Sequence, residues 1–252
     1  MCTVIVHVPE SAATGEPVRL LAVRDEDPAR TWDPLGEWWP EHPGVIGVRD
    51  RRAGGAWLAA DPAAGRVAVI LNRADVVTEP EETLGSRGHV VLDALTGAAG
   101  SGSGAAGAAG SGAAGERPRT HGYNLVEVTA AGARVTMWDG ATVRTVDLAP
   151  GIHMIAHDDI DDAHTARIAA WHDAFGVPAA DDAHWWEGWL DVLERTSAVG
   201  SVDDRAIVRD NRPFGYPTLS LLVCAASVGS DGADVRYGEF DEPGRWNRLT
   251  LR

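Results

Sequence analysis

The chain opens with Met1-Cys2-Thr3-Val4-Ile5-Val6-His7-Val8, and residues 3–8 have the pattern of a β-strand. Removal of Met1, which the small side chain of Cys2 favours, would leave a cysteine with a thiol and a free α-amine. These groups have ordinary pKa values of about 8.5 and about 7.7–8.0, so the amine can serve as the base for the thiol. The start of the chain therefore predicts Cys2 as a nucleophile at the head of the first strand. The alternative is a chance Met-Cys start with an inert, buried thiol.

The composition excludes several classes of function. All 22 basic residues are arginine, so a Schiff-base lysine, a phosphate-loop lysine and a Ser-Lys dyad are excluded. The formal net charge of −15 argues against nucleic acid and anionic membrane surfaces as partners.

The same composition bounds the architecture and the compartment. The 252 residues suit a single domain over 1–252, with a Gly/Ala/Ser insert at about 97–115 that buries too little to fold. No apolar run approaches the roughly 18 residues of a membrane span, so no membrane insertion is expected. The two cysteines, Cys2 and Cys224, cannot form a disulfide framework and favour a cytoplasmic location. The sequence does not fix the oligomeric state.

Charged residues follow the second predicted strand directly. Residues 20–23 are apolar, and Arg24-Asp25-Glu26-Asp27 come next. Ionised groups are costly to bury, so charges at the end of a buried strand mark either a site or an ordinary solvated strand end. Residues 27–55 show no clear period and are expected to form a long loop. Strands at 56–60 and 67–72 then predict a hairpin, with Asn72 at its end either capping a turn or facing a site.

The rest of the chain completes an α+β pattern. Further strands are predicted at 123–129, 135–138, 143–148, 151–157, 219–227, 234–239 and 246–251, and helices at 90–95, 161–175 and 182–195. Together these elements predict two stacked antiparallel sheets covered by helices. None of the nine histidines has zinc spacing with the cysteines, so no metal site is predicted. A haem attachment motif is absent, while a haem-ligating histidine stays open.

Several short motifs occur in an order that resembles a known family. They are Met1-Cys2-Thr3, Arg24-Asp25-Glu26, Gly54-Gly55-Ala56-Trp57-Leu58, Asn72, Ser86-Arg87-Gly88, Tyr123-Asn124-Leu125 and Pro150-Gly151. This series resembles the NRDE family, also called transport and Golgi organisation proteins. The resemblance implies a four-layer αββα sandwich similar to N-terminal nucleophile hydrolases, which include choloylglycine hydrolases and penicillin V acylase. Those relatives cleave amides with an N-terminal cysteine.

The resemblance also implies roles for individual residues. Cys2 would be the nucleophile, Asp25 would hold and polarise its amine, and Asn72 would donate to the oxyanion. Substrate binding would fall to Arg24, Asn124 and His157. The function implied is hydrolysis of an amide C–N bond in a small or amphipathic molecule, without a cofactor. The alternative is a non-catalytic carrier of haem or lipid on the same fold, since eukaryotic members of this family are implicated in haem movement and in Golgi and lipid homeostasis.

Three positions depart from the family's pattern. Val23 stands where the family name begins with asparagine, Ala156-His157 stands in place of a Ser-Asn pair, and Pro217 stands in place of an arginine. The retained Cys2 and Asp25 favour the enzyme, and the missing asparagine and arginine favour the carrier.

Overall fold

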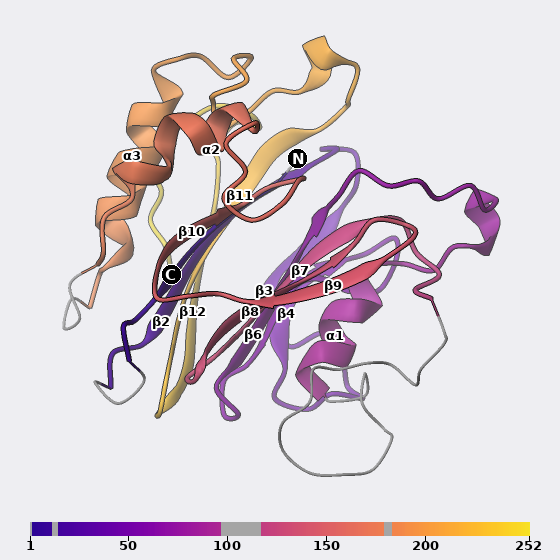
Figure 1. The fold of residues 1–252 in the computed structure, drawn as a ribbon, viewed down its shortest axis with the longest axis horizontal. Helices are drawn as coiled ribbons and strands as arrows, with labels where there is room; N and C mark the ends of the chain where they lie inside the picture. Colours follow the sequence, from indigo (N-terminus) through magenta and orange to yellow (C-terminus); the bar gives the residue numbers. More distant parts are fainter. Residues whose placement is uncertain (1, 12–14, 97–116, 179–182) are drawn as a thin grey trace.

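Two antiparallel β-sheets form the centre of the protein, with helices on both sides (Figure 1). The structure, a computed structural model, describes residues 2–11, 15–96, 117–178 and 183–252. The predicted insert at about 97–115 lies outside the described residues. The predicted α+β class with two antiparallel sheets and helices is confirmed.

The first sheet has five strands in the order β10-β1-β2-β11-β12. In register, Thr3 pairs with Val23 and Val4 with Ile155, so β1 lies between β2 and β10. Because β1 and β2 are antiparallel, the head of the chain meets the charged end of β2. The strands are β1 (Thr3–Val8), β2 (Val18–Glu26), β10 (Gly151–Ile155), β11 (Leu219–Gly229) and β12 (Gly232–Glu239).

The second sheet has seven strands that follow one another in chain order from β3 to β9. They are β3 (Trp32–Gly36), β4 (Ile46–Asp50), β5 (Ala56–Asp61), β6 (Arg66–Asn72), β7 (Tyr123–Thr129), β8 (Gly132–Trp138) and β9 (Val143–Asp147). The expectation of a long loop over 27–55 was wrong, because β3 and β4 lie within it. These strands are short and interrupted by Pro34 and by register shifts, which hides the alternation of side chains.

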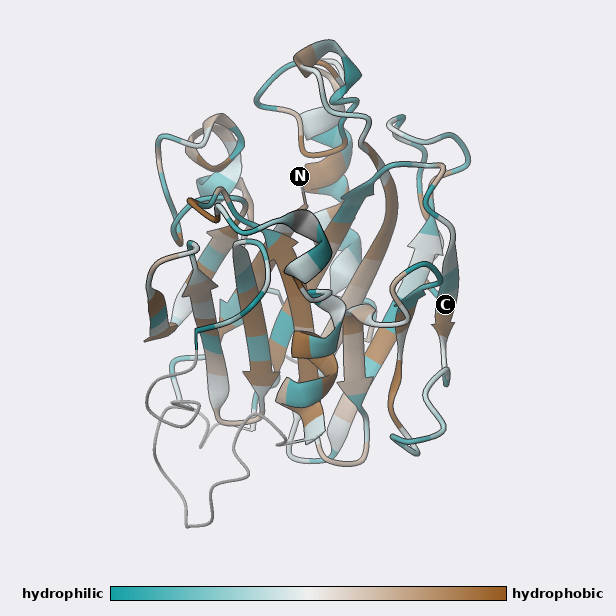
Figure 2. Cartoon of the chain, turned by 90° about the vertical axis from the view of Figure 1, so that its right-hand side faces the viewer, coloured by the Kyte–Doolittle hydropathy of each residue, from teal (hydrophilic) through white to brown (hydrophobic). Residues whose placement is uncertain are grey.

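The alternation of side chains along β1 divides the apolar residues into two cores. Val4, Val6 and Val8 belong to the core between the sheets. Ile5 points to the other face and packs with Leu21 in a second core, beneath the helices that cover the five-stranded sheet. In Figure 2, which colours each residue by its hydropathy, the strands are mainly hydrophobic and the connections between them are more hydrophilic.

Three α-helices cover the outer faces of the sheets. Helix α1 (Gly88–Thr96) packs on β5 and β6, while α2 (Ala166–Trp171) and α3 (Trp186–Ser197) cover the five-stranded sheet. Short 3₁₀ turns lie at Glu81–Thr83, His172–Ala174 and Arg212–Phe214. The apolar stripe predicted on the last helix is core packing, with the Trp185 and Trp189 rings edge to face at 5.3 Å.

The helix predicted over 161–175 is shorter, because Asp161 lies in a turn before it and a 3₁₀ turn at His172–Ala174 follows it. Asp161 has φ +55°, a left-handed conformation that a helix cannot continue. Its carboxylate instead lies 2.6 Å from His153 Nδ1 and accepts the backbone N–H of Met154 at 2.7 Å. These bonds fix a turn between β10 and α2, which begins only at Ala166.

The strand predicted at 246–251 was also wrong. This segment contacts β12 by backbone hydrogen bonds at Arg252, which exchanges N–H and C=O with Tyr237 at 3.0 and 3.1 Å. This single pair of residues holds the end of the chain against β12 but does not make it a strand. Of the helices in the described ranges, none has the length and apolar character needed to cross a membrane.

Candidate functional site

A cavity of about 400 Å³ opens where one end of the five-stranded sheet meets the seven-stranded sheet. Cys2, Arg24 and Asp25 line it from the first sheet, and Asn72 lines it from the end of β6 in the second. The structure therefore brings four of the six predicted site residues to one cavity. The remaining two, Asn124 and His157, lie outside its lining.

The Cys2 thiol contacts the backbone of Asp25 directly. The Asp25 N–H donates to Cys2 Sγ at 3.3 Å, and the thiol donates to the Asp25 carbonyl at 3.6 Å. Burial raises the pKa of the Cys2 thiol, whereas the N–H donated by Asp25 and the charge of Arg24 work in the opposite direction. With Met1 in place, the thiol is therefore protonated near neutral pH.

The Asp25 carboxylate is buried and held by two side chains. Ser220 Oγ donates to Oδ1 at 2.5 Å, and Asn211 Nδ2 donates to Oδ2 at 3.4 Å. Ser220 is on β11 directly opposite Asp25 in the register, next to a shift in the pairing at Leu222. Sequence reasoning missed both partners. The only signal was a polar residue at the start of an otherwise apolar strand.

A buried arginine lies behind the head of the chain. Arg167, on α2, is 1% exposed and donates to Thr3 Oγ1 at 2.9 Å. Burial lowers the pKa of its guanidinium to about 10, and the negative charge of Asp25 opposes that shift. Arg167 therefore remains charged at neutral pH, next to the residue that follows Cys2. Its position on a helix far along the chain gave no signal in the sequence.

Arg24 and Trp57 bring buried donors to the cavity wall. Arg24 is 2% exposed, its Nη2 lies 3.6 Å from Glu26 Oε2, and its guanidinium stacks 5.6 Å from the Trp32 ring centre. Arg24 Nη1 and Trp57 Nε1 have no hydrogen-bond partner among the described residues. Buried donors without partners are rare in folded proteins and call for an explanation.

Asn72 and Asn124 lie on neighbouring strands but in different surroundings. Asn72 is exposed at the cavity. Asn124 is fully buried, donates to the carbonyls of Ala156 and Asp158 at 3.0 and 2.8 Å, and accepts from Arg73 at 3.3 Å. Asn124 therefore ties β7 to the segment that follows β10.

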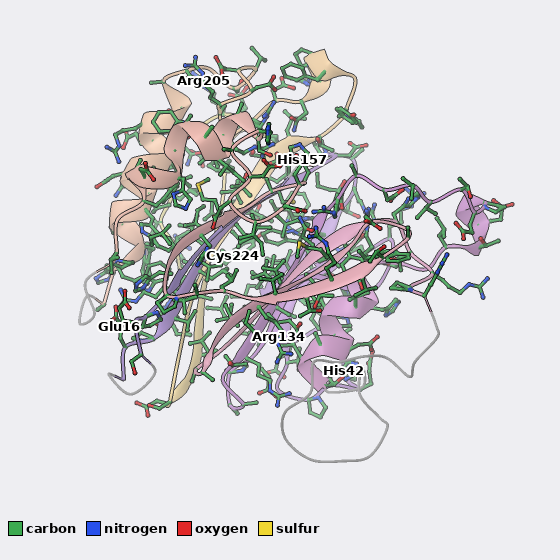
Figure 3. The ribbon with its side chains drawn as sticks, viewed as in Figure 1. Glu16, His42, Arg134, His157, Arg205 and Cys224 are labelled. Atoms are coloured by element: carbon green, nitrogen blue, oxygen red, sulfur yellow. The ribbon has the colours of Figure 1, made fainter. Side chains whose placement is uncertain are left out.

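His157 lies beyond the end of β10, in the region of the molecule where the chain begins (Figures 1 and 3). Its Nε2 is 3.1 Å from Asp158 Oδ2. Its Nδ1 is buried without a hydrogen-bond partner among the described residues. Burial lowers the pKa of the imidazole, and the charge of Asp158 opposes this shift. Cys224, by contrast, lies midway along β11, the fourth of the five strands in its sheet (Figure 3).

Two glycines bring the N-terminus of α1 against the cavity. A Cβ on Gly55 would lie 2.5 Å from the carbonyl carbon of Gly88, and a Cβ on Gly88 would lie 2.9 Å from Gly55. Only glycine at both positions permits this approach. Ser86 Oγ accepts the Gly88 N–H at 3.2 Å, and Arg87 Nη1 donates to the Gly122 carbonyl at 3.1 Å. The close approach at Gly55 thus allows Ser86, Arg87 and Gly88 to form one wall of the cavity.

All three departures from the family pattern lie away from the cavity lining, the Ala156-His157 pair included. Val23 is fully buried in the second core, on the face of β2 covered by the helices. Pro217 lines a neighbouring pocket of about 350 Å³ with Glu26 and Arg30. In the described part of the chain, no three His, Cys, Asp or Glu side chains form a group that could hold a metal ion.

The raised pKa of Cys2 predicts a strong pH dependence of its alkylation. In the chain that retains Met1, labelling by iodoacetamide should be slow at pH 7 and rise about tenfold per pH unit up to pH 9, following the thiolate fraction. Cys224, which is fully buried and whose pKa burial also raises, should stay unlabelled until the protein unfolds. Peptide mass spectrometry over a pH series measures both rates. A labelling rate at Cys2 that is already level between pH 7 and 8 would contradict the raised pKa.

Comparison with known proteins places the chain in a family. No curated protein matches it. A family model described as Transport and Golgi organisation 2 matches residues 1–176. This range contains Cys2, Asp25, Asn72 and the Ser86-Arg87-Gly88 motif, whereas Asn211 and Ser220 lie beyond it. Since the match covers more than half of the 252 residues, the chain belongs to the Transport and Golgi organisation 2 family.

Proposed function

We propose that the protein is an amidohydrolase of the N-terminal nucleophile type, with Cys2 as its nucleophile once Met1 is removed. One observation carries the proposal: Cys2 Sγ accepts the Asp25 N–H at 3.3 Å at the wall of a cavity that Asn72 also lines. A backbone N–H that donates to sulfur favours the thiolate, which is the nucleophilic form. The similarity of the fold to N-terminal nucleophile hydrolases is part of the same proposal.

The reaction would proceed by acyl transfer in two steps. The Cys2 thiolate attacks the amide carbonyl carbon, and the α-ammonium of Cys2 gives its proton to the departing amine, which leaves a thioester on Sγ. The free α-amine then takes a proton from water as the water oxygen attacks the thioester. This second step releases the carboxylic acid and restores the thiolate and the α-ammonium of Cys2. The Asn72 amide would donate to the oxyanion in both steps, and Asp25 would hold the α-amine.

The other predicted residues would support binding. Arg24 would contact the substrate from the cavity wall. Asn124 would act indirectly, because its amide already holds the carbonyls of Ala156 and Asp158. His157 belongs to the segment that Asn124 fixes and would position the head of the chain.

Processing and acyl capture test the proposal together. Purified protein should have an intact mass lower than that of the full sequence by one methionine residue. Incubation with a panel of acyl amides and acyl p-nitroanilides should release amine and place a transient acyl group on Cys2. Replacement of Asn72 by Ala should lower turnover about 10²–10³-fold if Asn72 donates to the oxyanion. Retained Met1, or an acetylated N-terminus, would exclude Cys2 as an N-terminal nucleophile.

That the protein is a non-catalytic carrier of haem or lipid stays a prediction. Haem ligation by His157 would have to replace its 3.1 Å contact with Asp158. A saturable Soret shift on titration with haem, lost in His157→Ala, would favour the carrier.

Both cysteines are free thiols. The hydrolase needs Cys2 as a free thiol, so we place the reaction in the reducing cytoplasm.

A further inference from the structure

The cavity carries more positive charge than its neighbours neutralise. Its lining contains four guanidinium groups, from Arg24, Arg30, Arg52 and Arg87, and the three carboxylates of Asp25, Glu26 and Asp50. This excess is notable in a chain whose formal net charge is −15. A local positive field in an acidic protein attracts an anion to that place.

The carboxylates are already engaged with groups other than the guanidinium groups of Arg52 and Arg87, and Arg52 contacts Asp50 through its backbone N–H at 2.8 Å. Arg30 Nε donates to Asp50 at 2.6 Å, Arg24 approaches Glu26, and Asp25 accepts from Ser220 and Asn211. Within the described ranges, no carboxylate lies within 4.0 Å of the guanidinium of Arg52 or Arg87. Arg87 is partly buried and spends one donor on the Gly122 carbonyl. Four of its five N–H donors remain for a ligand.

Two further features of the same wall favour an acceptor. The buried donors Arg24 Nη1 and Trp57 Nε1 have no hydrogen-bond partner in the described part of the chain. Helix α1 begins at Gly88, immediately after Arg87, so the positive end of its dipole lies at the cavity. Both features favour a ligand that accepts hydrogen bonds and carries negative charge.

We infer that the cavity binds amides that carry an acidic group, a carboxylate or a phosphate, with Arg87 as the residue that selects it. That the ligand is an amide rests on the proposed function. That it carries an acidic group rests on the cavity alone. Arg52, exposed at the cavity, and Arg24 would add to the positive field. A planar guanidinium matches the two oxygens of a carboxylate or phosphate. Burial lowers the pKa of Arg87, and the negative charges of Glu26 and Asp75 oppose this shift, as a bound anion would.

The position of Arg87 relates the acidic group to the reacting carbonyl. Arg87 and Cys2 line the same cavity, Arg87 from the segment before α1 and Cys2 from the head of β1. A substrate held by Arg87 would therefore place its amide near Cys2 Sγ within one cavity. The apolar lining from Ala56 and Ile70 would contact the uncharged part of the molecule.

Binding to the Cys2→Ala variant tests the inference without catalysis. The probes are N-butylsuccinamate, its neutral isostere N-butylsuccinamide, and N-butyl-3-phosphonopropanamide. Calorimetry should show the acidic probes binding about tenfold or more tightly than the neutral one at low salt, and the preference should shrink as NaCl rises. Comparison of the carboxylate and phosphonate probes shows which anion fits better.

Variants of two matched arginines identify the residue responsible. In the Cys2→Ala protein, the additional replacement Arg87→Gln should remove the preference for acidic over neutral probes. Arg87→Lys in its place should keep part of that preference. Arg66→Gln is the control, because Arg66 also donates Nη1 to a backbone carbonyl, that of Leu95 at the other end of α1, but lies outside the cavity. Thermal unfolding of each variant shows that it is folded. Equal affinity for acidic and neutral probes, including no binding of either, would overturn the inference, as would equal loss in Arg66→Gln.

The two proposals fail in different ways. If acidic probes bind through Arg87 but processed wild-type protein never cleaves them, the anion site is supported and the hydrolase is contradicted. If amides with and without an acidic group are cleaved at equal rates, the hydrolase is supported and the anion site is contradicted.

Discussion

Replacing Cys2 with Ala is expected to lower amide hydrolysis on the order of 10⁴-fold or more. The proposed mechanism passes through a thioester on Sγ, and the variant has no atom that can form it. The Asn72 amide and the cavity would still bind the substrate, so the loss should appear in kcat and leave KM nearly unchanged. Turnover of the best amide in the panel, measured on processed protein, provides the test.

Cys224→Ala is the matched control for this loss. Cys224 is the other thiol of the chain, fully buried among the strands of the five-stranded sheet and outside the cavity. Its replacement should leave kcat near the wild-type value and affect only stability. If the Cys2→Ala variant keeps more than about one tenth of the wild-type turnover, another group performs the attack and the proposed mechanism is wrong.

The sheets were predictable where the strands alternate and are bounded by turns. The hairpin at β5 and β6 and the meander from β7 to β9 have apolar runs separated by Gly-containing turns, which local sequence encodes. The same rules missed β3 and β4, which pair with each other, and β4 with β5, across shifts in register that hide the alternation of side chains. A register shift is defined by two paired strands, so a window that covers one strand does not contain it.

The site divides in the same way between local and distant information. Cys2 and Asp25 were identifiable because a strand head and a charged strand end are visible in short stretches of sequence. Ser220 and Asn211 hold Asp25 from almost 200 residues away, across a register that only the folded sheet defines. Arg87 stands in a motif that the sequence did single out. That its guanidinium has no carboxylate within 4.0 Å among the described residues, however, could be known only from the folded structure.

The close approach of two glycines predicts the largest effect on stability. Gly55→Ala is expected to lower the free energy of unfolding by about 1–3 kcal/mol, the usual cost of overpacking a tight contact. The added Cβ would lie 2.5 Å from the carbonyl carbon and 2.7 Å from the Cα of Gly88, distances that backbone atoms cannot tolerate. The N-terminus of α1 would have to move away from β5. Urea unfolding at pH 7 measures the change.

Gly188→Ala separates this contact from the general effect of a glycine replacement. Gly188 is exposed on α3, and a Cβ there would meet nothing within 4 Å. Alanine at that place should leave stability unchanged or raise it by up to about 1 kcal/mol, because alanine is the better helix former. A Gly55→Ala protein as stable as the wild type would show that α1 does not depend on the contact.

The same displacement should reach the cavity. Ser86 and Arg87 line it and immediately precede Gly88 in the chain, so a shift of α1 carries both away from Cys2. In the Cys2→Ala background, Gly55→Ala should therefore weaken binding of N-butylsuccinamate while leaving that of N-butylsuccinamide nearly unchanged. Loss of both affinities in equal measure would instead indicate that the whole cavity has collapsed. A selective loss would tie the glycine pair to the position of Arg87, because the apolar lining at Ile70 belongs to β6 and stays in place.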